Sequence, residues 1–104
     1  MMNIEKVIES VRKGQIKWQT HALARMLERY ISRDEVNEVI LYGDIIEEYP
    51  NDYPLPSCLI FYNDIKPLHV VLSYDEAIHV TYIITVYQPD LNHFEADFKT
   101  RRLQ

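Results

Sequence analysis

The strongest constraint on the fold is a pair of segments, residues 67–74 and 78–87, in which apolar side chains recur at every second position. Successive side chains of a strand point to opposite faces, so the even-numbered residues of each segment form one apolar face. A tight connection through residues 75–77 pairs Tyr74 with Ile78 and places the two apolar faces side by side. We therefore predict an antiparallel hairpin. Its apolar face carries Leu68, Val70, Leu72, Tyr74, Val80, Tyr82, Ile84 and Val86.

The opposite face of this hairpin is mixed in character, so it is the first place to search for a functional site. It carries His69, Val71, Ser73, His79, Thr81, Ile83, Thr85 and Tyr87. Two further runs of β-branched and aromatic residues, 44–49 and 57–63, are typical of strands. The prolines of the intervening YPNDYPLP segment favour a stiffened loop. Together these segments predict an antiparallel sheet of about four strands.

The N-terminal part of the chain is predicted to form helices that cover the apolar sheet face. Apolar residues recur at three- and four-residue spacing within residues 4–11, between Asn3 as N-cap and Gly14 as a stop. Thr20 is expected to cap a second helix over residues 21–30. The inward side of this second helix consists of Leu23, Met26, Leu27 and Tyr30.

A third helix is predicted from the S-x-x-E capping box that Ser32 and Glu35 form, and Gly43 ends it. Its inward residues are Val36, Val39 and Ile40. The predicted fold class is α+β, with three N-terminal helices packed on one face of the antiparallel sheet. We expect Leu23, Leu27 and Val39 to be buried against the even-numbered hairpin residues. The length is that of a single domain, residues 1–104.

Charge and cysteine content narrow the classes of function. The chain carries 16 acidic and 11 basic residues, so no global field draws it to nucleic acid or to an anionic membrane, and such a contact needs a local basic patch. Its four histidines and one cysteine lack the spacing of paired metal ligands, so we expect no metal and no cofactor. No signal peptide or membrane-spanning segment is evident, which predicts a cytoplasmic protein without membrane contact.

Five ordered motifs resemble those of a family of small, mostly prokaryotic proteins known as domain of unknown function 4258 (DUF4258). They are THALARMLERYIS at 20–32, GDIIEEYPND at 43–52, PLHVV at 67–71, ITVYQPD at 84–90 and FKTRR at 98–102. The family is similar to the compact RelE-type toxins, and its members are often encoded beside a small zinc-finger protein that resembles an antitoxin. The resemblance implies a RelE-like fold and an RNA endonuclease of the mRNA interferase type, ribosome-associated or free, that an antitoxin-like partner silences.

RNA cleavage without a metal needs a base, an acid and cations that stabilise the phosphate in the transition state. His21, Arg25 and Arg29 lie at i, i+4 and i+8 of the second helix, so they are expected to share a face suited to phosphate binding. The helix dipole disfavours the protonated form of His21 and leaves it as a candidate base. The alternative is a solvated face whose arginines pair with Glu28 or Glu35.

His69 and Tyr87 are the second pair of catalytic candidates, because both project onto the mixed sheet face. RelE-type nucleases frequently place tyrosine, arginine and lysine around the scissile phosphate, which adds to the case for Tyr87. Arg101 and Arg102 are then expected to bind the phosphate from the C-terminus. The alternatives are a structural histidine, a packing tyrosine and two solvated arginines.

The acidic net charge departs from the pattern of RelE-type toxins, which are typically basic. Two other classes therefore stay open: a noncatalytic protein-binding module that presents the open sheet face or the proline-rich loop, and an enzyme with a small-ligand pocket. A contiguous positive groove joining Arg25, Arg29 and Arg101 favours RNA, whereas dispersal of these arginines favours the module. A deep enclosed pocket around His69 favours the small-ligand enzyme.

Overall fold

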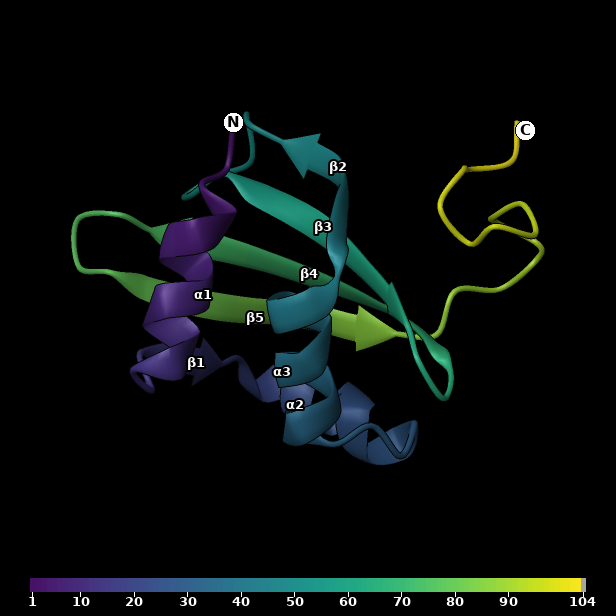
Figure 1. Cartoon of the computed structure of the whole chain (residues 1–104), viewed down its shortest axis with the longest axis horizontal. Helices are drawn as coiled ribbons and strands as arrows, with labels where there is room; N and C mark the ends of the chain where they lie inside the picture. Colours follow the sequence, from purple (N-terminus) through teal and green to yellow (C-terminus); the bar gives the residue numbers. More distant parts are fainter. Residues whose placement is uncertain (104) are drawn as a thin grey trace.

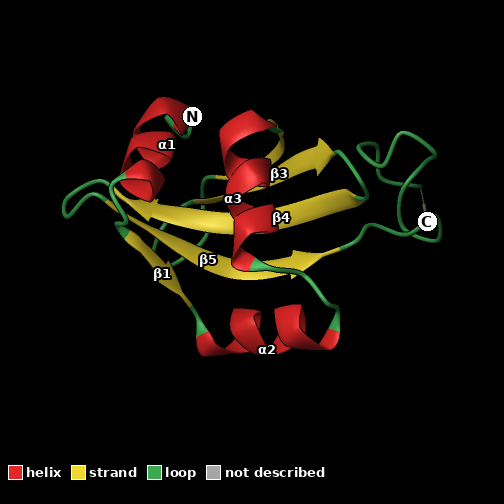
Figure 2. Cartoon of the chain, turned by 60° about the horizontal axis from the view of Figure 1, so that its bottom comes forward, coloured by secondary structure: helices red, strands yellow, loops and turns green. Residues whose placement is uncertain are grey.

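Three helices cover one face of a five-stranded sheet in the computed structural model, which describes residues 1–103 (Figure 1). In chain order the elements are α1 (Ile4–Arg12), β1 (Ile16–Trp18), α2 (Thr20–Glu28), α3 (Arg33–Tyr42), β2 (Asp44–Tyr49), β3 (Ser57–Asn63), β4 (Pro67–Asp75) and β5 (Val80–Tyr87). Figure 2 shows α1 and α3 side by side on the sheet, with α2 along the edge that β1 forms. The α+β class is as predicted.

Local capping signals set the ends of α1 and α3. The Asn3 side chain accepts a hydrogen bond from the backbone of Lys6 at 3.2 Å. Ser32 and Glu35 form both hydrogen bonds of a capping box, and Gly43 is the C-cap of α3. These boundaries agree with the sequence predictions because a cap depends on neighbouring residues alone.

α2 is shorter than predicted, and two of its predicted inward residues are exposed. It follows Gln19, which makes no side-chain capping bond, and it ends at Glu28. Tyr30 lies beyond the end of the helix and is 89% exposed, whereas Leu27 lies within the helix on its solvent side and is 80% exposed. The core side of α2 is made of Ala22, Met26 and the half-buried Leu23, and Ile31 enters the core after the turn.

The sheet is mixed and has the strand order β1-β5-β4-β3-β2. β1 runs parallel to β5, with Lys17 opposite Tyr82, whereas all other neighbours are antiparallel. The prediction of four antiparallel strands thus missed β1. This strand has only three residues, which are too few to display an alternating pattern.

The predicted hairpin exists, but its register was wrong. Tyr74 pairs with Thr81, and a register shift follows between Val71 and Leu72 of β4. On β4 the predicted face is confirmed, since Leu68, Val70, Leu72 and Tyr74 are all in the core beneath the helices. On β5 the inward residues are Thr81, Ile83 and Val86, while Val80, Tyr82 and Ile84 are only partly buried.

The connection between β4 and β5 explains this register. The connection consists of residues 76–79, so it is one residue longer than predicted. Asp75 and Val80, which flank it, form the last pair of the hairpin. The Asp75 side chain accepts a hydrogen bond from the backbone of Ala77 at 3.0 Å, and His79 has a positive φ of 56°. This longer turn reverses the inward and outward faces of β5 until the irregularity near Ile84 restores them.

The helices hold no membrane-spanning candidate: within residues 1–103, none is both long enough and apolar enough to cross a bilayer.

Candidate functional site

Five polar side chains gather on the sheet face opposite the helices, and we refer to them as the polar cluster. They are Glu47 and Tyr49 on β2, His69 on β4, Tyr87 on β5 and Arg101 on the C-terminal segment. His69 and Tyr87 are direct cross-strand neighbours, at the end of the sheet where β4 begins and β5 ends (Figure 1). The predicted pairing of these two residues on one face is therefore present.

The hydrogen bonds of His69 define its tautomer. Nε2 lies 2.6 Å from the main-chain oxygen of Phe98, and Nδ1 lies 3.2 Å from the hydroxyl of Tyr87. A carbonyl oxygen only accepts, so Nε2 carries the proton and Nδ1 accepts from Tyr87. Burial lowers the pKa of His69 below its ordinary value of 6.5, and burial raises the pKa of Tyr87. Near neutral pH the pair is thus a neutral imidazole and a neutral phenol.

His69 is fully buried, so it does not present its ring to a ligand. Its ring packs edge-on against Phe61 and Phe94, with ring centroids 5.6 and 4.6 Å away. Phe94 belongs to the segment after β5, which covers His69 from the solvent side. His69 lines none of the cavities described below, so it can act on a ligand only through Tyr87.

Glu47 holds Arg101 in a two-point ion pair. Nε and Nη2 of the arginine lie 2.7 and 3.0 Å from the two carboxylate oxygens, and the Tyr49 hydroxyl also donates to Glu47. Burial opposes ionisation of Glu47, but these hydrogen bonds outweigh it and its pKa lies below the ordinary value. Burial raises the pKa of Tyr49 to about 12. Arg102 pairs with Glu95 at 3.0 Å, so neither arginine of the predicted phosphate site is unpaired.

The basic row predicted on α2 is not a continuous cationic face. Arg25 pairs with Glu28 at 3.0 Å, and Arg29 donates to the main-chain oxygen of Val86 at 2.8 Å. His21 lies in the first turn of α2 and Arg29 just after the last, about 12 Å apart along the axis at about 1.5 Å per residue. His21 is therefore about two helical turns from Arg29, and neither residue belongs to the polar cluster.

One open groove joins two of the predicted site residues. It has a volume of about 460 Å³ and is lined by Arg29, Tyr87, Gln88 and Asp90. The hydrogen bond from His93 holds the pKa of Asp90 below its usual range, so the groove has one anionic side. We call it the Arg29–Tyr87 groove. It offers a guanidinium and an oriented phenol to a ligand, but neither Arg25 nor Arg101 lines it.

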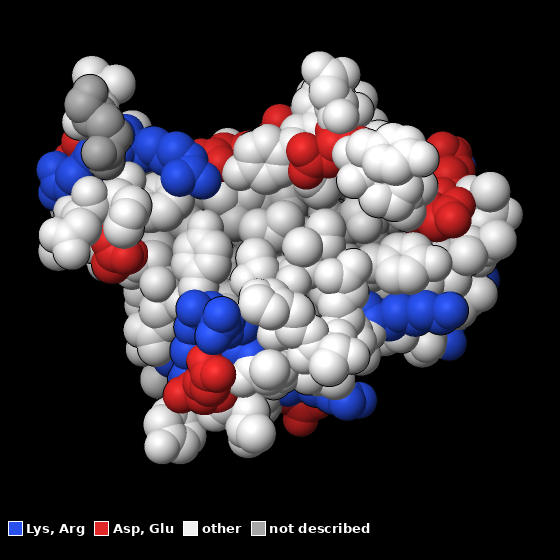
Figure 3. All heavy atoms as spheres, turned by 180° about the vertical axis from the view of Figure 1, so that it is seen from behind, with Lys and Arg blue, Asp and Glu red and all other residues white. Residues whose placement is uncertain are grey.

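The rest of this sheet face carries little charge. Figure 3 shows an uncharged middle, with acidic and basic side chains interspersed around the margins. Arg25 and Arg101 do not line the groove that Arg29 lines, so these three arginines share no positive groove of the kind that we associated with RNA binding. Within residues 1–103, no three His, Cys, Asp or Glu side chains come together in a way that could hold a metal ion.

Glu47 and Tyr49 are site residues that were not predicted from the sequence. Both lie at alternate positions of the predicted strand 44–49, so period-two spacing places them on one face. That signal was available, but their approach to Arg101 depends on the fold.

Comparison with known families gives one match. A family described as "Domain of unknown function (DUF4258)" matches residues 18–88, which include the last residue of β1, the helices α2 and α3, and the strands β2 to β5. No curated protein matches the chain, and no solved structure does.

Proposed function

We propose that this chain, which belongs to the DUF4258 family, is a toxin-like, metal-independent RNA endonuclease of the mRNA interferase type. The observation that supports the proposal is that Arg29 and Tyr87 line one open groove, while His69 orients the Tyr87 hydroxyl from behind. The resemblance to RelE-type toxins supplies the reaction class, and we include a RelE-like fold relationship in the proposal.

The chemistry that we propose is attack of an RNA 2′-oxygen on the adjacent phosphorus. The bond from phosphorus to the 5′-oxygen breaks, which leaves a 2′,3′-cyclic phosphate and a 5′-hydroxyl. The 2′-hydroxyl proton moves to the Tyr87 oxygen as the Tyr87 proton moves to Nδ1 of His69, and water protonates the departing 5′-oxygen. Arg29 stabilises the charge on the phosphoryl oxygens. The nearby Glu47 carboxylate favours the transient imidazolium of His69.

In this proposal Tyr87 and Arg29 touch the RNA, and His69 acts through Tyr87. His21, Arg25, Arg101 and Arg102 have no direct part in the groove. The partners that we propose are RNA, free or on the ribosome, and an antitoxin-like protein of the zinc-finger type that silences the nuclease in the cytoplasm.

The test compares RNA cleavage by wild-type protein and two groove variants, on free RNA and on translating ribosomes. Tyr87→Phe removes the hydroxyl and keeps the ring, so cleavage should fall by about 10²- to 10⁴-fold. Arg29→Ala should weaken cleavage as well, because the guanidinium is lost. Tyr53→Phe is the matched control for tyrosine, since Tyr53 is 95% exposed and outside the groove; Arg25→Ala is the control for arginine. Both controls should cleave like wild type.

Two results together would overturn the nuclease hypothesis. They are normal growth on high expression of soluble wild-type protein and the absence of cleavage on translating ribosomes. Loss of activity in Arg25→Ala equal to that in Arg29→Ala would also remove the groove from the mechanism.

A noncatalytic binding module is the second candidate, and it is supported by the lack of a groove that Arg25, Arg29 and Arg101 line together. Each of these guanidiniums already has an acidic or main-chain partner. For a module, Tyr87→Phe should leave cell growth on overexpression unchanged, and substitutions in the middle of the open sheet face should weaken partner binding.

A further inference from the structure

Three large apolar side chains are exposed where the α2–α3 turn meets the β3–β4 turn. Leu27, Tyr30 and Ile65 are 80%, 89% and 95% exposed. The two turns are adjacent, because Nζ of Lys66 donates to the main-chain oxygen of Tyr30 at 3.2 Å. We call this region the Tyr30–Ile65 surface. Exposed aromatic and aliphatic side chains that gather in this way are typical of an interaction site.

The backbone of Tyr30 adds to this argument. Its φ of 56° lies in the left-handed region, which glycine and asparagine adopt more readily than tyrosine. An asparagine would make the same turn without exposing an aromatic ring. Since the ring is almost wholly in solvent, no packing within the chain explains a tyrosine there. The ring is therefore accessible to a contact outside the chain.

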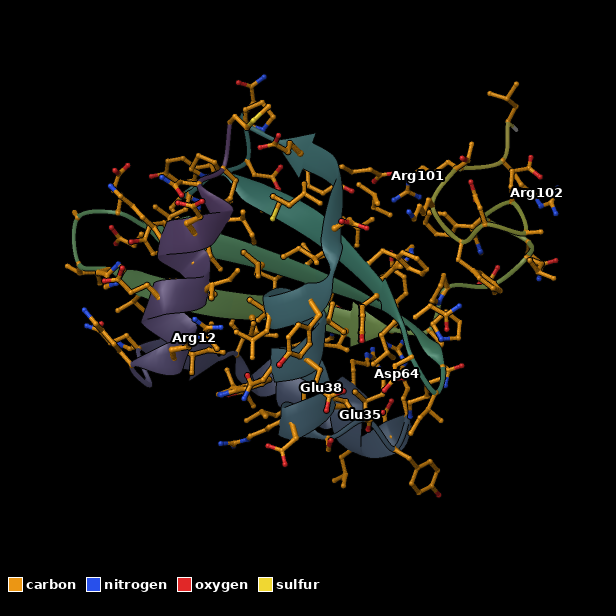
Figure 4. All side chains as sticks on the ribbon, viewed as in Figure 1. Arg12, Glu35, Glu38, Asp64, Arg101 and Arg102 are labelled. Carbon is orange, nitrogen blue, oxygen red and sulfur yellow. The ribbon has the colours of Figure 1, made fainter. Side chains whose placement is uncertain are left out.

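A small hollow of about 40 Å³ continues this surface and includes Ile65 and Lys66. Its apolar lining is Val39, Tyr62 and Leu68. Its rim carries three carboxylates, Glu35, Glu38 and Asp64, which lie near one another between α3 and the β3–β4 turn (Figure 4). Glu35 pairs with Lys66 at 3.2 Å. Glu38 and Asp64 have no hydrogen bond or ion pair with another side chain in the part of the chain described.

The size and chemistry of the hollow restrict its occupant. A buried water needs roughly 10–15 Å³, so the hollow fits the end of one side chain, whereas small-molecule sites measure roughly 300–1,000 Å³. Lysine and arginine combine an apolar stem with a cationic head, which suits an apolar lining beneath two unpaired carboxylates. The charge of the whole chain, −5, also favours a basic partner.

We propose that the Tyr30–Ile65 surface and this acidic hollow dock a basic segment of a partner protein. A lysine or arginine of that segment enters the hollow between Glu38 and Asp64, and a neighbouring apolar residue packs on Tyr30 and Ile65. No residue that lines the hollow lines the Arg29–Tyr87 groove, so this inference stands independently of the proposed nuclease.

The test uses short random peptides displayed on phage and selected on the full-length protein. The selected peptides should share a lysine or arginine close to an aromatic or aliphatic residue. Their Kd, measured with labelled synthetic copies by fluorescence anisotropy, should rise about tenfold or more in the E38Q/D64N variant, because two carboxylates are lost. Ile65→Ser should weaken binding too, and thermal unfolding should show that both variants are folded.

The matched control is E5Q/E76Q, which removes the same charge from exposed positions outside the hollow. It should change the Kd by less than about twofold. Selection of peptides without basic residues, an unchanged Kd in E38Q/D64N, or no selected peptide would each overturn the proposal. So would a wild-type dimer in sedimentation that Ile65→Ser dissociates, since the occupant is then a second copy of the chain.

Discussion

Nε2 of His69 donates a hydrogen bond to the main-chain oxygen of Phe98 at 2.6 Å, across 29 positions of the sequence. This bond joins the central strand, β4, to the irregular C-terminal segment. It also determines that Nδ1 of His69 is the acceptor for Tyr87. One contact therefore covers the histidine and sets the orientation of the tyrosine that we place in the groove.

The burial of His69 predicts a pH dependence of stability. Its folded-state pKa is below 6.5, so between that pKa and 6.5 the unfolded chain binds more protons than the folded chain. The free energy of unfolding should be fully retained above about pH 6.5 and should fall as the pH decreases below it. Urea unfolding at several pH values from about 7.5 to 5 measures this change, since ordinary carboxyl groups titrate mostly below this range. His69→Gln should show a smaller fall; equal falls in both proteins would contradict the assignment.

The buried contact of Ser10 with Thr81 predicts an asymmetry between two substitutions. Ser10 Oγ donates its one proton to Val7 O at 2.9 Å, so Thr81 Oγ1 must be the donor in their 2.6 Å contact. Ser10→Ala leaves the Thr81 hydroxyl buried without this acceptor and should destabilise the fold by about 1–3 kcal/mol. Thr81→Val leaves Ser10 satisfied and should lower stability by only about 0.5–1.5 kcal/mol. Urea unfolding gives both values, and the reverse order would refute the donor assignment.

The two glycines should respond differently to substitution. A Cβ on Gly43 would lie 2.5 Å from the main-chain oxygens of both Phe61 and Val39, so Gly43→Ala forces the backbone apart and should destabilise by about 1–3 kcal/mol. Gly14 has open space around it but a φ of 73°. Asparagine tolerates that conformation, so Gly14→Asn should change stability little, whereas Gly43→Asn should be as harmful as alanine. Thermal unfolding of the three variants tests this contrast.

The pair of Glu47 with Arg101 should contribute modestly to holding the C-terminal segment. The side chains are 20% and 53% exposed, so solvent screens the pair and we expect a coupling of about 1 kcal/mol in a double-mutant cycle. The cycle uses E47Q, R101Q and the double variant. The exposed pair of Glu9 with Lys13 is the control and should couple more weakly. Faster amide exchange around Phe94 in R101Q would show that the segment loosens; a coupling no larger than the control's would contradict this role.

Local signals predicted much of the fold. The caps at Asn3 and Ser32, and the stop at Gly43, depend on residues within one helical turn, so short stretches of sequence contain them. The inward face of β4 was also readable, since its even-numbered residues are all apolar. On β5, by contrast, the inward residues Thr81, Ile83 and Val86 include a polar threonine, while Val80, Tyr82 and Ile84 are as apolar but only partly buried. The alternation alone therefore could not decide its face, which the turn at 76–79 sets.

The candidate site was predicted in part for a similar reason. His69 and Tyr87 are neighbours in a hairpin, so the strand pattern brings them together even when the register is inexact. The contacts of Arg101 with Glu47, and of Arg29 with Val86, join distant parts of the chain. Their partners depend on how the C-terminal segment and α2 pack, and no local pattern encodes that packing.

The place of β5 in the sheet has a consequence for synthesis of the protein. β5 is synthesised after the other four strands of the sheet, yet β1, α1 and α2 all pack on it. In a nascent chain that ends before Val80, the apolar sides of α1 and α2 lack the strand on which they mainly pack. Partly synthesised chains with such exposed apolar surface are prone to aggregate and bind chaperones. Tyr87 is the last residue of β5. The groove lined by Arg29, Tyr87, Gln88 and Asp90 can therefore assemble only after the chain has been synthesised beyond Asp90.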